Sequence, residues 1–126
     1  MIGWIGRPLG GKITGKTATE LLTLGPNSPL ATAASLIPAG VILLGVTTQV
    51  TEAITGAASY NVGDGAMPDI YGGAIATVLG TTSKLADHTS DPLRWMPASE
   101  DVEIGAVGGN FTGGKLLITV HYLELL

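Results

Sequence analysis

Residues 10–17, GGKITGKT, match the phosphate-loop pattern G-x-x-x-x-G-K-T. That chemistry needs a buried strand before the loop and a helix after it, so that backbone amides and the helix dipole converge on the phosphates. Arg7 and Pro8 interrupt any preceding strand, and Gly25-Pro26 follows before a useful helix could form. We therefore interpret the segment as a flexible arm rich in Gly and Thr, and expect no nucleotide cofactor.

Acidic residues in turns raise the question of a calcium site. The candidates are Asp64, Asp69, Asp87 and Asp91. Calcium takes about six to eight oxygen ligands, and the 12-residue loop pattern of an EF-hand is missing from this sequence. Turn aspartates more commonly accept hydrogen bonds from their own backbone. The prediction is that the chain holds no metal.

Two histidines, His88 and His121, are the only imidazoles in the chain. Residues 87–91, DHTSD, contain the residue types of a hydrolase relay, but neighbouring side chains on one short loop point apart. His121 lies in the middle of an expected strand, where packing or an interface role is the usual outcome. We expect no catalytic residue and no enzymatic activity.

The aromatic residues suggest a contact surface. They are Trp4, Tyr60, Tyr71, Trp95, Phe111 and Tyr122. Trp95 follows Arg94 in an irregular segment, and Trp and Arg are both enriched in interface cores, so both residues are predicted to bind a protein partner. A sugar-stacking platform that uses Trp95 or Tyr71 is the alternative. Tyr60 and Tyr122 are expected in the core.

Strands must position these residues. From residue 42 to 54 the even positions are mostly apolar and the odd ones mostly polar, which is the pattern of a strand with one buried face. Further strands are expected near residues 58–63, 70–79, 101–107 and 115–125, with a polar loop over 80–98. Little helix is expected, because Gly and Pro punctuate the chain. The sequence predicts an all-β fold, a β-sandwich of which the jelly roll is one form.

Two segments carry a resemblance to a known family. AITGAASYNVGDG at residues 53–65 is followed by DIYG at 69–72, and GGNFTGGKLLITVHYLEL occupies residues 108–125. Together they resemble a β-sandwich module of virion proteins from tailed bacteriophages and gene-transfer agents, often found at the C-terminal end of fibre-like or spike-like proteins. The resemblance covers roughly residues 38–125. It implies a structural role in a virion, on a scaffold that does not itself define a chemistry.

Composition narrows the classes further. The chain has 126 residues, 45% of them hydrophobic and only 13% charged, with a net charge of −4 and no cysteine. Disulfides and thiolate metal sites are excluded. The longest apolar run, residues 36–46, is far shorter than the roughly 20 residues that cross a bilayer, so no membrane partner is expected. The low charge favours a surface covered by neighbouring subunits.

Charge is distributed unevenly along the chain. Residues 1–40 carry three cations against one acid, and residues 41–126 carry three cations against nine acids. Three spread cations are too few for a nucleic-acid site. We predict an extended, mobile N-terminal arm over residues 1–36 and a β-sandwich domain over 37–126. The arm is expected to bind its partner through Trp4, Ile5, Arg7, Leu9, Lys12 and Lys16.

The function expected from these observations is structural. With its own Met1 and no fibre shaft, the chain is predicted to be a decoration or cement protein bound to the major capsid protein, on the capsid surface of a virion assembled in the host cytoplasm. A terminal strand that is apolar on both faces predicts a homotrimer. The alternative is the receptor-binding tip of a head or tail fibre that grips host polysaccharide.

Overall fold

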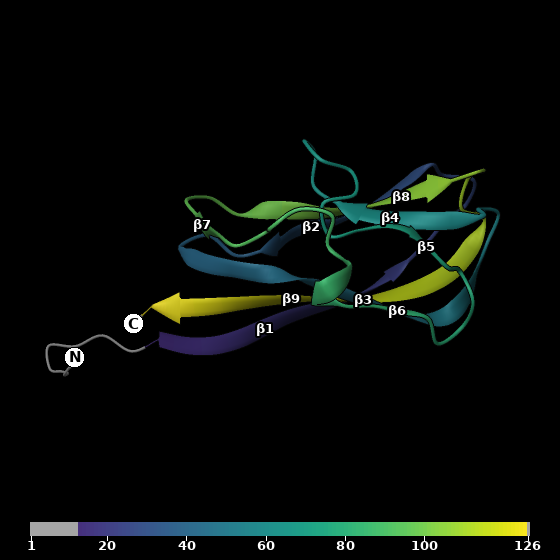
Figure 1. Ribbon diagram of the computed structural model, residues 1–126. Coiled ribbons are helices and arrows are strands. Elements are labelled where there is room, and N and C mark those ends of the chain that lie inside the picture. The colour runs from purple at the N-terminus through teal and green to yellow at the C-terminus, as the bar shows by residue number, and fades with distance from the viewer. Residues whose placement is uncertain (1–12, 126) are drawn as a thin grey trace, which may run out of the picture.

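Two antiparallel sheets face each other in the computed structural model, which describes residues 13–125 (Figure 1). The five-stranded sheet contains β1 (Ile13–Thr23), β9 (Gly113–Leu125), β3 (Val41–Thr55) and β6 (Thr82–Ser83) in that order, with β7 (Arg94–Met96) also pairing with β3. The four-stranded sheet contains β2 (Leu30–Ile37), β8 (Glu100–Val107), β4 (Ser59–Gly63) and β5 (Gly72–Ile75). A 3-10 turn, η1 (Leu85–Asp87), lies between β6 and β7. The predicted all-β sandwich is confirmed.

The strand order is that of a jelly roll. Leaving β7 aside, the first strand pairs with the last (β1 with β9), the second with the last but one (β2 with β8), then β3 with β6 and β4 with β5. This pairing is what a long hairpin produces when it rolls up into two facing sheets. β7 is an addition that extends the five-stranded sheet beside the first residues of β3.

The core between the sheets is built mainly from aliphatic side chains with three large aromatic residues. Tyr60, Tyr71 and Phe111 are fully buried. Val46 of β3 and Ile118 of β9 pack in the same cluster from the facing sheet. The expectation for Tyr60 is therefore confirmed, whereas Tyr122 is only partly buried and packs against the margin of the core.

β3 changes the face that it buries. Val41 and Leu43 are buried at its beginning, but Val46 and Val50 are buried after a register shift beside Gly45. The uniform alternation expected over residues 42–54 is therefore wrong at its start, where Ile42 points outward. A bulge adds one residue to one strand and reverses the facing of all the residues on one side of it.

The N-terminal third is not an arm over its described part. Residues 13–23 form β1, which pairs with β9 through eleven residues, and β2 pairs with β8 and buries Ala33 and Ile37. The predicted arm over residues 1–36 is thus wrong for residues 13–36. The prediction weighed only side-chain burial against ordering entropy, whereas β8 and β9 each need a partner strand for their backbone groups.

The middle of the chain differs from expectation in a similar way. The strand expected over residues 70–79 is shortened to β5, and the expected loop over 80–98 contains β6, η1 and β7. Within residues 13–125 there is no helix long and apolar enough to span a membrane.

Candidate functional site

A row of apolar side chains crosses the outer side of the five-stranded sheet. Ile42 of β3 lies opposite Leu123 of β9 on one side and opposite Trp95 of β7 on the other. Opposed residues in antiparallel strands point to the same face. The adjacent Val41 and Met96 are buried, so the row points away from the core. The Trp95 side chain is 53% exposed, as predicted for a contact residue.

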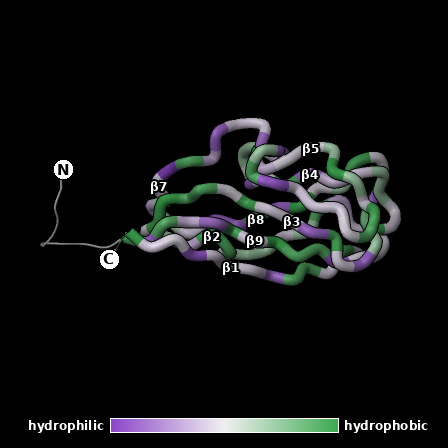
Figure 2. The backbone as a smooth tube through the Cα atoms, turned by 60° about the horizontal axis from the view of Figure 1, so that its bottom comes forward, coloured by the Kyte–Doolittle hydropathy of each residue, from purple (hydrophilic) through white to green (hydrophobic). Residues whose placement is uncertain are grey.

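Further rows continue this surface along β1 and β9. In order along β9 they are Leu125 with Ile13, His121 with Thr17, Thr119 with Thr19 and Thr47, and Leu117 with Leu21 and Gln49. No Asp, Glu, Lys or Arg occupies an outward position of β1, β3, β7 or β9 between the Leu125 row and the Leu117 row. We call this surface the neutral face. Figure 2 turns this sheet toward the viewer and colours it by hydropathy.

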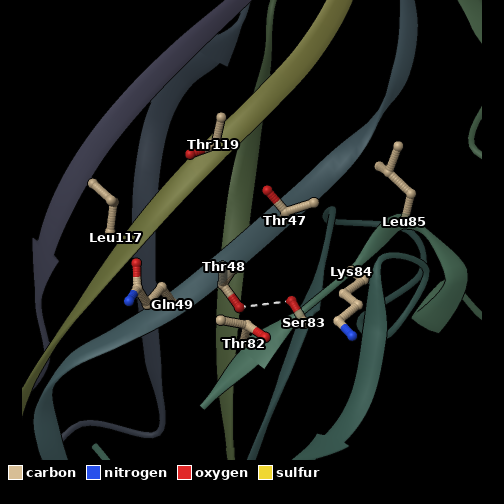
Figure 3. A pocket seen from close by; sticks show the side chains of 9 residues that line it. All are labelled: Thr47, Thr48, Gln49, Thr82, Ser83, Lys84, Leu85, Leu117 and Thr119. Atoms are coloured by element: carbon tan, nitrogen blue, oxygen red, sulfur yellow. Dashed lines mark hydrogen bonds between the residues drawn. The ribbon is translucent and has the colours of Figure 1, made fainter. Parts of the chain in front are cut away.

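A groove of about 360 Å³ borders the neutral face where β6 and η1 rise beside β3 (Figure 3). Thr47, Gln49 and Thr119 line one side, and Thr82 and Lys84 line the other. Six of the nine lining residues carry a hydroxyl or amide group. Such groups can exchange hydrogen bonds with a polar ligand, but the groove holds no buried charge and no aromatic platform among its lining residues.

A chain of buried hydroxyls lies beneath the groove. Thr48 Oγ1 is 2.7 Å from Ser83 Oγ and 2.8 Å from Tyr60 OH, and all three residues are buried. These contacts connect β3 to β6 in its own sheet and to β4 in the facing sheet. The three hydroxyls satisfy one another inside the core, which is what buried polar groups require.

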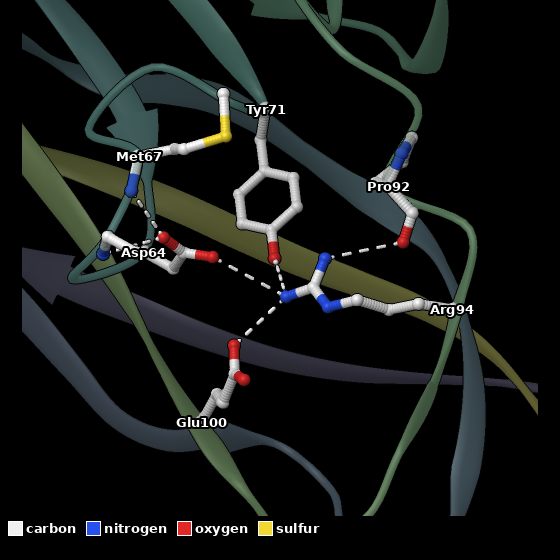
Figure 4. A network of polar contacts seen from close by, with 7 residues as sticks. Asp64, Met67, Tyr71, Pro92, Arg94 and Glu100 are labelled. Carbon is white, nitrogen blue, oxygen red and sulfur yellow. Dashed lines mark hydrogen bonds and ion pairs between the residues drawn. The ribbon is translucent and has the colours of Figure 1, made fainter.

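Arg94 is the centre of a polar network at the β7 end of the sandwich (Figure 4). Its guanidinium donates to Glu100 Oε1 at 2.9 Å, to Tyr71 OH at 3.1 Å and to Asp64 Oδ2 at 3.5 Å. Asp64 also accepts from the backbone N–H of Met67 at 2.7 Å. Burial raises the pKa of Tyr71, and the hydrogen bond from Arg94 opposes this rise. The network ties β7 to the four-stranded sheet.

His88 closes a gap in the edge of β3. Its Nε2 accepts a hydrogen bond from the backbone N–H of Val46 at 3.1 Å, so Nδ1 carries the proton and donates to the carbonyl of Lys84 at 3.3 Å. Burial lowers the pKa of His88, which keeps the ring neutral. The ring also meets the edge of Tyr71. These bonds assign His88 a structural role.

His121 lies on the neutral face. Its Nε2 is 2.8 Å from Thr47 Oγ1. No contact between His121 and a carboxylate is present among residues 13–125, so the His–Thr pair lacks the third group that orients a catalytic base. The expectation that the chain is not an enzyme stays a prediction.

The residues predicted to bind a partner do not form one group. Trp4, Ile5, Arg7, Leu9 and Lys12 lie outside the described residues. Lys16, expected in the arm, projects from β1 and forms an ion pair with Glu124 at 2.7 Å, and this hydrogen bond raises the pKa of Lys16.

Arg94 and Trp95 are adjacent in β7 but point to opposite sides of it. The Trp95 side chain is on the neutral face, whereas the positive charge of Arg94 is already compensated by two carboxylates within the chain. Their roles in partner binding stay predictions. Tyr71, offered as an alternative sugar platform, is fully buried and cannot stack on a ligand in this structure.

The structure also accounts for the phosphate-loop pattern and the turn aspartates, which the sequence analysis did not interpret as ligand sites. Lys16 and Thr17 of the phosphate-loop pattern lie in β1, so a strand replaces the helix that the pattern needs. Asp64 and Asp91 each accept a backbone N–H within their own turn. The described residues contain no group of three or more His, Asp or Glu side chains that could hold a metal ion.

Sequence reasoning missed the neutral face as a whole. It identified a terminal strand that is apolar on both faces, and Trp95 as a contact residue, but not that Ile42 lies between them on one surface. The reason is the bulge at Gly45, where β3 changes the face that it turns toward the core, because an alternation pattern does not reveal such a bulge. The groove depends on residues 82–85, a segment whose strand and 3-10 turn carry no periodic signal.

Comparison with known proteins gives a fold-level likeness. No protein-family model matches the chain, and no curated protein matches it. Among solved structures, a chain in the cyanophage Pam1 capsid asymmetric unit is similar, with a TM-score of 0.58 and 19% sequence identity. The match covers 98% of this chain and 93% of that one, so the two are of about the same length. At this identity the likeness establishes a shared fold from end to end.

Proposed function

We propose that this chain is a structural protein of a phage particle, and more specifically a decoration or cement protein on the capsid surface. The observation that carries the proposal is the end-to-end likeness to a chain of a cyanophage capsid asymmetric unit. A fold alone does not define a function, but a match that covers both chains almost completely leaves little of either to be a separate module. The partner proposed is the major capsid protein.

The charge distribution supports a surface-bound role. The neutral face carries no Asp, Glu, Lys or Arg, while Asp101 and Glu103 lie on the outer side of the four-stranded sheet, beside the buried Val102 and Ile104. A protein held between a capsid and solvent needs one face that can be covered at low desolvation cost and one that stays hydrated. The sandwich has both.

The proposal extends to activity, assembly and oligomeric state. We propose that the protein is not an enzyme, since His88 is used to close the edge of β3. Assembly in the host cytoplasm follows from a capsid role. For the bound protein we propose the homotrimer expected from the sequence, with the exposed Trp95 among its contact residues.

A second candidate function is a receptor-binding tip for host polysaccharide. The groove beside the neutral face favours it, because Thr47, Thr82 and Gln49 offer the hydroxyl and amide groups that recognise sugars. The jelly roll also serves lectin domains as well as capsids. Trp95 is exposed enough to stack on a sugar ring.

A particle-binding experiment separates the two candidates. Purified full-length protein is mixed with particles from a phage that lacks the gene for this chain. In a separate sample it is mixed with the surface polysaccharide of the host. Saturable binding to heads, at many copies per particle, supports decoration. Retention on polysaccharide without binding to heads supports the fibre tip. Binding to neither contradicts both proposals. A Thr82→Ala variant, which alters the side of the groove that lies outside the neutral face, should bind heads normally if the protein is a decoration protein.

A further inference from the structure

The neutral face is uncharged on a molecule that is otherwise acidic. The chain has a net charge of −4, yet none of its ten acidic residues occupies an outward position on this face. Two copies that approach through the four-stranded sheet would bring Asp101 and Glu103 toward one another. Approach through the neutral face brings together outward positions that carry no charge, with Lys84 only at the border of the face, so little charge is buried.

Several large apolar side chains on this face are more than half exposed to solvent. Trp95 is 53% exposed, Ile13 is 70% exposed and Leu21 is 54% exposed. Isolated exposed apolar residues are ordinary, but here they belong to one sheet surface. Trp95 shares a row with Ile42 and Leu123, Ile13 lies opposite Leu125, and Leu21 lies opposite Leu117. An uncharged sheet face with several exposed apolar side chains is a candidate contact surface.

The residue types along the strands of this face form a symmetric pattern, so that the face is complementary to a second copy of itself related by a two-fold rotation. An apolar zone around Leu123 and Trp95 is followed by a hydroxyl zone around Thr119 and then by a second apolar zone at Leu117 and Leu21. A two-fold axis lying between two such faces places apolar on apolar and hydroxyl on hydroxyl, whether the axis runs along the strands or across them. Self-complementarity of this kind is the condition for an isologous contact.

We infer that the neutral face binds a second copy of this chain, so that the free protein forms a two-fold dimer by packing sheet against sheet. This inference concerns the free protein and does not depend on the proposed capsid role, because a capsid that covers the same face would replace the second copy. It also differs from the homotrimer expected from the sequence, because a trimer contact joins two different surfaces, and the other sheet face is acidic.

The size of the face sets the strength of the contact. Strands β1, β9 and β3, spaced about 4.8 Å apart, with about nine residues each rising about 3.3 Å, give a flat footprint of roughly 400 Å² per copy. Uneven side chains and Trp95 raise the accessible area, so the two copies together bury on the order of 1,000 Å². This lies at the lower limit for a specific interface, and a dimer of micromolar affinity is expected rather than an obligate one.

Light scattering after size-exclusion chromatography tests the inference on the full-length protein. The mass should rise from 12.7 kDa toward twice that value as concentration increases from about 1 to about 200 µM. Thr119→Lys places a charge at the centre of the face and should keep the protein monomeric throughout this range. The matched control is Thr32→Lys, which makes the same charge change on an exposed position of β2 in the other sheet. It should dimerise as wild type does.

Cysteine cross-linking gives a second readout that does not depend on a disruptive variant. The chain has no native cysteine. Residues near a two-fold axis approach their own copies, so Thr119→Cys should oxidise to a covalent dimer faster than Thr32→Cys. Circular dichroism should confirm that all four variants keep the wild-type fold.

Three results would overturn the inference. The wild-type protein could stay monomeric over the whole range, its mass could correspond to a trimer, or Thr119→Lys could associate as readily as Thr32→Lys. If the wild type is monomeric while Thr119→Lys loses binding to particles, the face is covered by the capsid and the second copy is rejected as its occupant.

Discussion

Thr48 connects three strands through its hydroxyl, and its replacement by Val gives the sharpest test of the fold. Thr48 is 4% exposed, Ser83 is 2% exposed and Tyr60 is fully buried. Thr48→Val keeps the shape of the side chain but removes both hydrogen bonds at 2.7 and 2.8 Å. The Tyr60 and Ser83 hydroxyls then lose a partner in a region closed to solvent.

The expected loss of stability follows from the cost of leaving buried polar groups unpaired. Each such group costs about 1–3 kcal/mol. The Tyr60 and Ser83 hydroxyls can each shift toward another acceptor and recover part of this cost, so together they should cost about 2–3 kcal/mol. This is a large share of the about 5–15 kcal/mol that holds a domain folded. For a chain of this length the melting temperature should fall by roughly 10 °C.

Urea unfolding followed by circular dichroism measures this change, with Thr32→Val, an exposed position on β2, as the control. The double variant Thr48→Val with Tyr60→Phe should lose less than the sum of the two single variants, because both single changes break the same hydrogen bond. A Thr48→Val loss below about 0.5 kcal/mol, or strict additivity, would refute the buried hydroxyl chain.

Three further predictions concern other contacts. Burial lowers the pKa of His88 in the folded protein. The stability that the neutral ring provides is therefore fully present above about pH 6.5, the pKa in the unfolded chain, and is lost as pH falls through the lower pKa of the folded state. His88→Gln should flatten the pH dependence of stability in that window, and an unchanged dependence would contradict the contact with Val46. Gly114→Ala should destabilise by more than about 3 kcal/mol, since φ is +114° and the new Cβ would lie 2.7 Å from Ile54 Cα, whereas Gly105→Ala, with nothing within 4 Å, should be nearly neutral in the same thermal melts. Trp95→Ala should change stability by less than about 1 kcal/mol but weaken self-association about tenfold, and equal association would remove Trp95 from the contact.

The fold class could be predicted because the chain's main strands alternate in the period of a strand. Ile118 and Val120 in β9, and Val102 and Ile104 in β8, are buried as their alternation indicates. The jelly-roll pairing could only be named as one form of sandwich, since pairing between β1 and β9 joins residues about a hundred positions apart, beyond the reach of local pattern.

The failures have physical causes. β1 and β2 contain many Thr and Ala residues, and an estimate from side-chain burial does not count the backbone hydrogen bonds by which β1 pairs with the edge of β9. The outward facing of Ile42 depends on the bulge at Gly45, where Leu85 and His88 occupy the space that a Cβ would need. Both effects are set by residues distant in sequence. Exposure of Trp95 was predictable because its flanking Pro92 and Pro97 shorten any strand around it.

The copy number of this chain in purified virions tests the proposed function most directly. Quantitative mass spectrometry, with the major capsid protein of the same particles as the internal standard, gives the ratio without a binding assay. A decoration protein should be present at a fixed ratio to the capsid subunits, on the order of hundreds of copies per particle, as the symmetry of a closed shell requires. A few copies per particle would indicate a fibre tip, and absence from the particle would contradict the structural role altogether.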